Sequence, residues 1–193
     1  MKQKKSLLYV AACIIAGFAL VFITNIINKD TPPKLSLNGT ELDLSKLEIS
    51  DLNKAGFWLS NNDASMSGST FRESLSYYWG DDRTISMGGV SVLNRRNSTA
   101  PYVNCDVFEI TAKSQDKAGN PTGLQATYEG KEFFGKTKEE LIALFGEPAE
   151  ESVSYQLVYR SKKKQYKTTF YFDTKTHECY LIEINRRESN LVR

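Results

Sequence analysis

Two short stretches of this chain follow one pattern, and this repetition constrains the fold more than any other feature. Cys105-Asp-Val-Phe-Glu109-Ile110 is matched by Cys179-Tyr-Leu-Ile-Glu183-Ile184, with Glu in the fifth place and Ile in the sixth. Each stretch is typical of a β-strand and closes a segment that begins with a short helix-like run. The repetition predicts an α+β protein with two related helix-plus-antiparallel-sheet units in tandem.

Pro, Gly and polar clusters indicate where these units begin and end. The Pro32-Pro33 pair is typical of a stiff linker, and Gly119-Asn120-Pro121 is typical of a connector. The predicted organisation is, in chain order, a Lys cluster with an apolar run (1–28), a linker (29–34), a first α+β unit (35–112), a connector (113–123) and a second α+β unit (124–193).

The apolar run near the N-terminus predicts a membrane anchor. It is free of charge from Leu7 to Ile23, and Ile26 and Ile27 extend it. About 20 apolar residues cross a bilayer as a helix. Lysines precede the run and are expected to stay cytoplasmic, which places the rest of the chain outside. We therefore expect a single-pass protein of the cell membrane with an extracytoplasmic C-terminal part.

Two alternatives to an uncleaved anchor remain open. A cleaved signal peptide is one, although no clear small-x-small cleavage site follows the run. The other is lipidation of Cys13, because Val10-Ala11-Ala12-Cys13 is similar to a bacterial lipobox. All three place the folded part outside the cytoplasmic membrane.

The charge balance argues against a nucleic-acid partner. The formal net charge is +2, but Lys2, Lys4 and Lys5 precede the apolar run, so the remainder carries 22 basic and 23 acidic side chains. A part so nearly neutral has no overall electrostatic attraction to a polyanion.

Outside the cytoplasm, Cys105 and Cys179 form an even pair that predicts a disulfide. Strand alternation puts each Cys on the same face as its Glu, and it puts Ile110 and Ile184 on the opposite, core face. The two thiols are therefore expected on matching faces away from the core. The alternative is two unpaired, half-buried thiols.

The first unit is expected to begin with a strand from Leu35 that ends near Asn38-Gly39, followed by a short helix and three further strands. Ser50 is the expected N-cap of the helix, and Gly56 ends it. The strands are expected at Phe71 to Trp79, Ile85 to Leu93 and Tyr102 to Thr111.

The second unit has the clearer helix signals. Thr137 and Glu140 make a capping box, and Gly146 with Pro148 ends the helix. Three strand-like runs follow, at residues 153–159, 166–172 and 179–185. They predict a helix followed by a three-stranded meander.

The run Gly135-Lys-Thr137-Lys-Glu-Glu140-Leu-Ile-Ala-Leu-Phe-Gly146-Glu-Pro148 resembles a known signature. It is similar to that of β-lactamase-inhibitor-like domains and of small outer-membrane assembly lipoproteins of the SmpA/OmlA type, best over residues 135–185. The resemblance implies helices against one face of an antiparallel sheet, often in tandem, whose open face binds another protein. Residues 50–56 lack the preceding Gly-x-Thr and the Gly-x-Pro stop. The apolar anchor also differs from that of the outer-membrane members and favours a cell with one membrane.

No pattern of catalytic, cofactor-binding or metal-ligating residues is present, so we expect none of these sites. His177 is the one histidine and lies in a predicted turn, and its order relative to Cys105 does not match a sortase-type transpeptidase. The spacing of Cys and His fits no zinc site, and there is no EF-hand loop. The Gly pairs do not precede helices, as phosphate-binding loops would.

The expected function is therefore non-enzymatic. We expect a binding or scaffolding module of the cell envelope whose partner is an envelope or secreted protein. The candidate partner-facing residues are Tyr78, Tyr171, Glu109 and Glu183. An envelope enzyme, or an accessory subunit acting on cell-wall or peptide substrates, is the alternative, and a deep pocket lined by Cys105 and His177 would favour it. A sensor or immunity-type protein is a third option.

Overall fold

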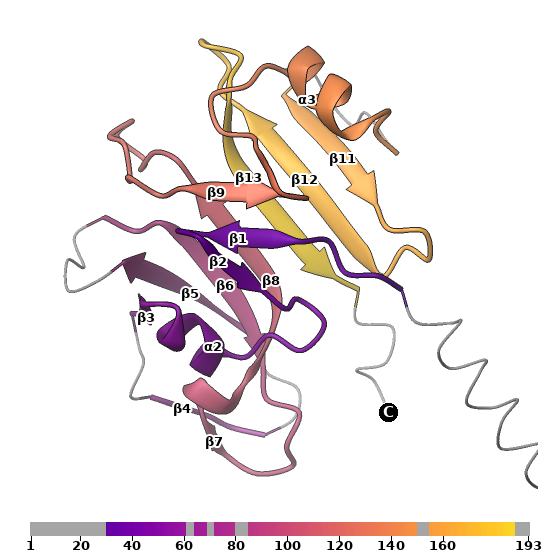
Figure 1. Cartoon of the computed structure of the whole chain (residues 1–193). Helices are drawn as coiled ribbons and strands as arrows, with labels where there is room; N and C mark the ends of the chain where they lie inside the picture. Colours follow the sequence, from indigo (N-terminus) through magenta and orange to yellow (C-terminus); the bar gives the residue numbers. More distant parts are fainter. Residues whose placement is uncertain (1–29, 61–63, 69–71, 80–84, 150–154, 188–193) are drawn as a thin grey trace, which may run out of the picture. The chain divides into compact units, whose positions relative to one another are not determined.

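The computed structural model describes residues 30–60, 64–68, 72–79, 85–149 and 155–187 (Figure 1). The chain from Pro32 onward forms one compact unit. The predicted span and the alternative lipidation site at Cys13 lie outside the described residues. Of the helices that are described, none has both the length and the hydrophobicity needed to cross a bilayer.

The compact unit is rich in β-sheet, with two short α-helices, so it belongs to the α+β class. Its first part contains β1 (Leu35–Leu37), β2 (Thr40–Leu42), α2 (Ile49–Lys54), β3 (Phe57–Leu59), β4 (Ser65–Met66), β5 (Arg72–Trp79), β6 (Gly88–Leu93), β7 (Ala100–Pro101), the 3-10 helix η1 (Tyr102–Asn104) and β8 (Asp106–Lys113). Its second part contains β9 (Ala126–Tyr128), β10 (Lys131–Glu132), α3 (Lys138–Phe145), β11 (Gln156–Arg160), β12 (Tyr166–Phe172) and β13 (Cys179–Arg186).

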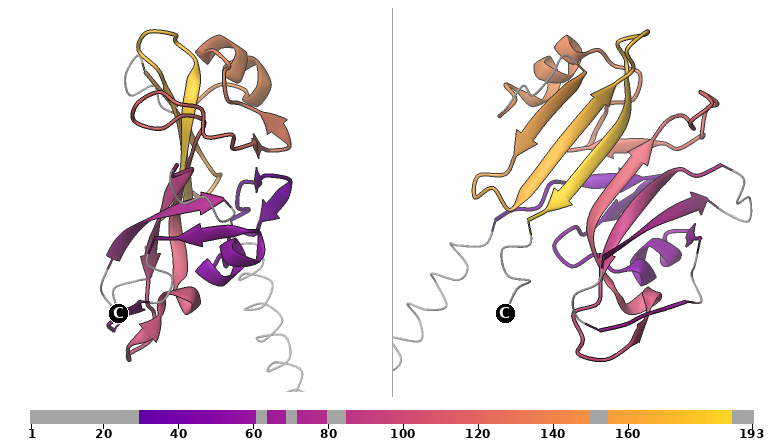
Figure 2. Two further views of the ribbon diagram at one scale, coloured as in Figure 1. Left: turned by 90° about the vertical axis from the view of Figure 1, so that its left-hand side faces the viewer. Right: turned by 180° about the vertical axis from the view of Figure 1, so that it is seen from behind.

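Most of the strands join one large antiparallel sheet. The seven-stranded sheet has the order β11-β12-β13-β8-β6-β5-β3, and a four-stranded sheet has the order β10-β9-β1-β2. Strands β4 and β7 form a separate pair. The view turned by 90° shows the small sheet and both helices on the same side of the large sheet (Figure 2).

The core lies between the two sheets. Phe170 of the large sheet is fully buried, and its ring lies 5.3 Å from that of Tyr128, 5.4 Å from that of Phe133 and 5.7 Å from that of Phe145. These partners come from the small sheet, from the segment after it and from α3. The ring contacts therefore tie three elements to one face of the large sheet.

The two predicted units share this sheet and this core. They meet where β8 pairs with β13, and the two isoleucines of the repeated pattern, Ile110 and Ile184, lie directly opposite each other. Glu109 pairs with Asn185, and Glu183 pairs with Thr111, so the register is symmetric about the isoleucine pair. The origin of the two parts as tandem copies stays a prediction.

The small sheet repeats this symmetry, and most of its strands were not predicted from the sequence. Hairpins β1–β2 and β9–β10 turn at Asn38-Gly39 and Glu129-Gly130, where all four residues have positive φ. This backbone is the tight hairpin turn in which Asn-Gly is favoured. Strand β1 pairs with β9, and Ser36 lies opposite Thr127. The expected strand from Leu35 is therefore present, but its partner on β9 was not predicted.

The helix predicted in the second unit is confirmed in detail. Thr137 is the N-cap of α3, its Oγ accepts a hydrogen bond from the Glu140 amide at 3.4 Å, and the Glu140 carboxylate accepts one from the Thr137 amide at 2.7 Å. The chain leaves the helix at Gly146 with φ of 85°. Local capping rules were sufficient here because all the signals are close in sequence.

Several boundaries in the first unit were wrong. The N-cap of α2 is Glu48, two residues before the predicted Ser50, because Glu48 and Asp51 form the capping box. The predicted strand at Tyr102 begins as η1, and β8 starts only at Asp106. The strand expected from Ile85 starts at Gly88.

Candidate functional site

One face of the seven-stranded sheet is covered by no described helix or strand, and we call it the open face. It faces the viewer in the right-hand view of Figure 2, with the small sheet and the helices behind. Its residues alternate along the strands with core residues such as Tyr77, Ile110 and Phe170. They include Ser76, Tyr78, Ser91, Glu109, Thr111, Lys167, Thr169, Tyr171, Glu183 and Asn185, together with the apolar Val158 and Leu181.

A β-bulge in β8 brings Glu109 to the open face. Val107 pairs with Val92 and Glu109 pairs with the adjacent Ser91, so Phe108 is the extra residue. An extra residue reverses the alternation of side chains along a strand. Cys105 and Val107 therefore face the core before the bulge, and Glu109 faces outward after it.

A second bulge does the same in β13. Cys179 pairs with Phe172 and Leu181 pairs with the adjacent Tyr171, which leaves Tyr180 as the extra residue. Cys179 is consequently buried on the core side, while Glu183 lies on the open face. The prediction that each Cys shares a face with its Glu was wrong for this reason.

Glu109 is held by two uncharged donors. The Ser91 hydroxyl donates to Glu109 Oε1 at 3.0 Å, and Asn185 Nδ2 donates to Glu109 Oε2 at 2.8 Å. Ser91 and Asn185 are its neighbours on the two adjacent strands. These contacts fix the carboxylate on the sheet without neutralising its charge.

Glu183 lies diagonally opposite, and Tyr171 holds it. The Tyr171 hydroxyl donates to Glu183 Oε2 at 3.2 Å. Burial raises the pKa of Glu183, and the negative charge of Glu109 adds to the increase, against the opposing effects of Tyr171 and Lys167. Burial, together with the adjacent Glu183, also raises the pKa of Tyr171 to about 12.

Thr169 completes this polar centre of the open face. It lies opposite Glu183 on β12, its side chain is 1% exposed, and its Oγ finds no hydrogen-bond partner among the described residues. An unsatisfied buried hydroxyl costs about 1–3 kcal/mol. Thr169, Asn185 and Ser91 were not predicted from the sequence as part of a site, because their placement depends on cross-strand register.

The structure brings three of the four predicted partner-facing residues together. Glu109, Glu183 and Tyr171 lie on neighbouring strands, while Tyr78 lies on the same face at β5. Tyr78 pairs with Trp58 of the edge strand β3, and Trp58 is 37% exposed. This aromatic pair forms a second part of the open face, and Trp58 was not predicted.

The predicted disulfide does not form in this structure. Both thiols are free and buried. Each Cys precedes its isoleucine by five residues on antiparallel strands, so the two lie at opposite ends of the β8–β13 pair, roughly 30 Å apart. A disulfide requires Cα atoms within about 7 Å. The matched positions in sequence are thus separated by the antiparallel direction of the strands.

Neither thiol has the surroundings of a nucleophile. Burial raises the pKa of Cys179 to about 12, and burial with the nearby Asp106 raises the pKa of Cys105. His177 is exposed in the turn before β13, at the end of the β8–β13 pair away from Cys105. The described residues contain no group of three or more His, Cys, Asp or Glu that could hold a metal ion.

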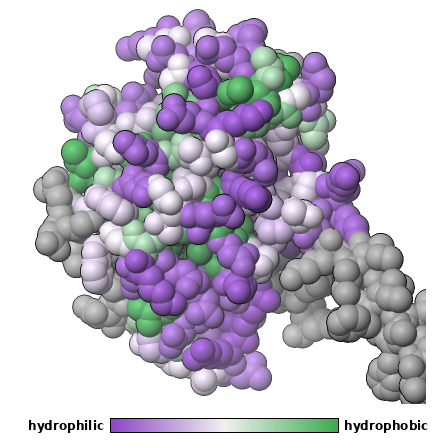
Figure 3. All heavy atoms as spheres, in the orientation of Figure 1, coloured by the Kyte–Doolittle hydropathy of each residue, from purple (hydrophilic) through white to green (hydrophobic). Residues whose placement is uncertain are grey.

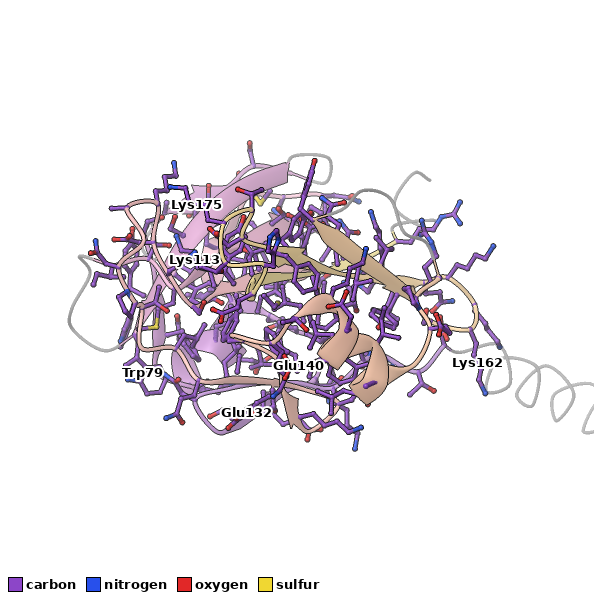
Figure 4. The ribbon with its side chains drawn as sticks, turned by 90° about the horizontal axis from the view of Figure 1, so that it is seen from above. Trp79, Lys113, Glu132, Glu140, Lys162 and Lys175 are labelled. Carbon is purple, nitrogen blue, oxygen red and sulfur yellow. The ribbon has the colours of Figure 1, made fainter. Side chains whose placement is uncertain are left out.

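The opposite side of the compact unit, where the small sheet and the helices lie, is largely hydrophilic (Figure 3). An open groove with a volume of about 370 Å³ runs along β9 there and includes Glu132 and Phe134. Figure 4 shows Glu132 and Glu140 on this side, away from Lys113 and Lys175, with Trp79 and Lys162 at opposite ends. The groove contains no cluster of side chains with a chemical role.

Comparisons of the chain with models of protein families, with curated proteins and with solved structures gave no match. The resemblance over residues 135–185 therefore stays a prediction.

Proposed function

We propose that this chain is a protein-binding or scaffolding module and that the open face of the seven-stranded sheet receives its partner. The observation that carries the proposal is the contrast between the two faces of this sheet. One face is packed under the small sheet and both helices, whereas the other carries half-buried carboxylates and aromatic side chains that no described element covers. Exposed and half-buried aromatic side chains are enriched in protein interfaces.

The spread of polar and aromatic groups over this surface supports binding to a macromolecule. Its polar groups extend along β12, β13, β8 and β6, and Trp58 and Tyr78 lie farther out on β3 and β5. Polar groups spread over several strands can contact an extended partner surface. Cys105 and His177, which an enzyme with a Cys–His pair would bring together, lie at opposite ends of the β8–β13 pair.

The proposal includes the location of the module. Residues 1–28 are proposed to anchor it in the cell membrane, with residues 35–112 and 124–193 as tandem α+β units outside the cytoplasm. The apolar run from Leu7 supports the anchor, and the symmetric register of β8 with β13 supports the tandem origin. Protease treatment of intact cells should degrade the C-terminal part, and protection of that part would contradict this location.

Site-specific photo-crosslinking in intact cells tests the binding surface. The full-length chain would carry benzoylphenylalanine at Tyr78 or Tyr171, and a control would carry it at Glu41, which is exposed on β2 of the small sheet. We expect one discrete adduct from both open-face positions and none from position 41. Equal adducts from all three positions, or none from Tyr78 and Tyr171, would refute a partner on this face.

A further inference from the structure

We propose that the open face binds the guanidinium group of an arginine side chain of the protein partner, held between Glu109 and Glu183. This inference rests on the proposed function and specifies the chemistry of the partner at one point. The recognition element is a pair of carboxylates at the centre of the sheet, with Thr169 and Tyr171 beside it.

The positions of the two carboxylates fit a planar, multidentate cation. Glu109 pairs with Asn185, and Glu183 is two residues before Asn185, so the two glutamates are diagonal neighbours. Diagonal neighbours across an antiparallel pair have Cα atoms about 7–8 Å apart. A guanidinium group has five N–H donors in a fixed plane and can donate to two carboxylates at once.

No described cation forms an ion pair with either glutamate, although the charge of Lys167 acts on Glu183. Lys46–Asp43, Lys54–Asp51 and Arg95–Asp106 are ion pairs of the described residues, and none of them involves Glu109 or Glu183. Lys167 lies on the same face, opposite Asn185, and forms no ion pair with either glutamate. Two carboxylates held by Ser91, Asn185 and Tyr171 therefore leave a site of negative charge for a positively charged group.

The unsatisfied hydroxyl of Thr169 independently indicates a ligand at this place. Its hydroxyl oxygen is buried on the open face opposite Glu183, and among the described residues it accepts and donates no hydrogen bond. Native proteins satisfy most buried polar atoms. A guanidinium, which carries donors alone, can supply the missing bond while it contacts Glu183.

Tyr171 distinguishes arginine from lysine as the incoming residue. Its ring is half-buried on the open face, and its hydroxyl is already bonded to Glu183. A guanidinium stacks on an aromatic face more readily than a compact ammonium does. The site thus combines acceptors at the centre with an aromatic surface at the side.

Titration of the full-length protein in neutral detergent micelles, followed by NMR, tests the site directly. The probe is N-acetyl-arginine amide, and the matched control is N-acetyl-citrulline amide, which has nearly the same shape but no charge. We expect saturable shifts at residues 109, 169, 171 and 183 with the arginine probe, with a Kd on the order of 1–10 mM. No saturable shift with arginine, or equal shifts with citrulline, would overturn the proposal.

Charge-removing variants connect this binding to the two carboxylates. Glu109→Gln with Glu183→Gln should weaken the arginine probe by about tenfold or more, which is about 1.4 kcal/mol. The control, Glu41→Gln with Glu132→Gln, removes two charges from exposed positions of the small sheet and should leave affinity unchanged. An equal loss in both double variants would show that net charge alone drives binding and would contradict the site.

The same variants separate this inference from the proposed function. In the crosslinking experiment, the Glu109→Gln/Glu183→Gln protein with benzoylphenylalanine at Tyr78 should lose most of its adduct. An undiminished adduct would refute the arginine site while the binding function remained supported. No adduct from the unsubstituted protein would refute the proposed function itself, whatever the probe does in the titration.

Discussion

The two faces of the seven-stranded sheet are stabilised by different interactions, although the same strands supply both. On β12, Phe170 is fully buried among rings of the small sheet and α3, whereas its neighbour Tyr171 is half-buried and bonded to a carboxylate. On β6, Gly88 lies against Tyr77 on the covered face, whereas Gly89 faces the open one. The side chains of the covered face are held by close packing, so substitutions that change their size should lower the stability of the protein. The side chains of the open face are held by hydrogen bonds and charge, so substitutions that change their size should have little effect on stability.

The largest expected effect is the loss of the central ring on the covered face. Phe170→Ala should lower the free energy of unfolding by about 3–5 kcal/mol, because it leaves a cavity among four aromatic side chains. The matched control is Tyr171→Phe on the open face, which keeps the ring and should cost about 1 kcal/mol. Urea unfolding followed by circular dichroism measures both, and similar losses would contradict the contrast between the faces.

A second difference concerns the thiols on the covered face. Because burial raises the pKa of Cys179 to about 12, its thiolate fraction at neutral pH is about a thousandfold below that of an ordinary thiol. We expect iodoacetamide to leave Cys105 and Cys179 unmodified in the native protein and to alkylate both after denaturation without reductant. Mass spectrometry that finds a 105–179 disulfide would overturn this arrangement.

Gly88 and Gly89 are adjacent in sequence and face opposite sides of the sheet, so the same substitution at each position compares the two faces. A Cβ at residue 88 would lie 1.9 Å from the Thr111 carbonyl oxygen and 2.5 Å from the Tyr77 hydroxyl oxygen. Gly88→Ala should therefore destabilise the protein by about 1–3 kcal/mol. At Gly89 the nearest atom would be 3.4 Å away, so Gly89→Ala should change stability by about 0.5 kcal/mol or less. Thermal unfolding compares the pair, and equal midpoints would show that Gly88 is not confined.

The smallest expected effect is a pH dependence on the open face. The pKa of Glu183 is raised above the usual 4.5, so the folded protein binds its proton more tightly than the unfolded chain does. This contribution to stability is complete below about pH 4.5 and is lost as the pH rises through the pKa of the folded state. Glu183→Gln removes the group that titrates. The free energy of unfolding of this variant, minus that of the unsubstituted protein, should therefore rise with pH by less than about 1 kcal/mol.

Unfolding curves measured from pH 4 to pH 8 check this prediction. Glu41→Gln is the control, since Glu41 is exposed on β2. A relative stability of Glu183→Gln that falls with pH, or the same rise in the control, would contradict the stated electrostatics.

Local signals in the sequence predicted local structure well. The capping box at Thr137 and Glu140 predicted where α3 begins, and Asn38-Gly39 marked the end of β1. The outward positions of Glu109 and Glu183 were also predicted from strand alternation. The same alternation was wrong for Cys105 and Cys179, because the bulges at Phe108 and Tyr180 are defined by the partner strands.

The sequence by itself determined that the chain is α+β, that it repeats a strand pattern and that its helix in the second unit has a defined start and end. These features depend on residues within a few positions of one another. Only the tertiary structure decided that β8 and β13 lie side by side, that the two thiols are far apart, and that Thr169 lies opposite Glu183. The physical reason is that antiparallel register and bulges are properties of paired strands, so they form only when distant segments meet.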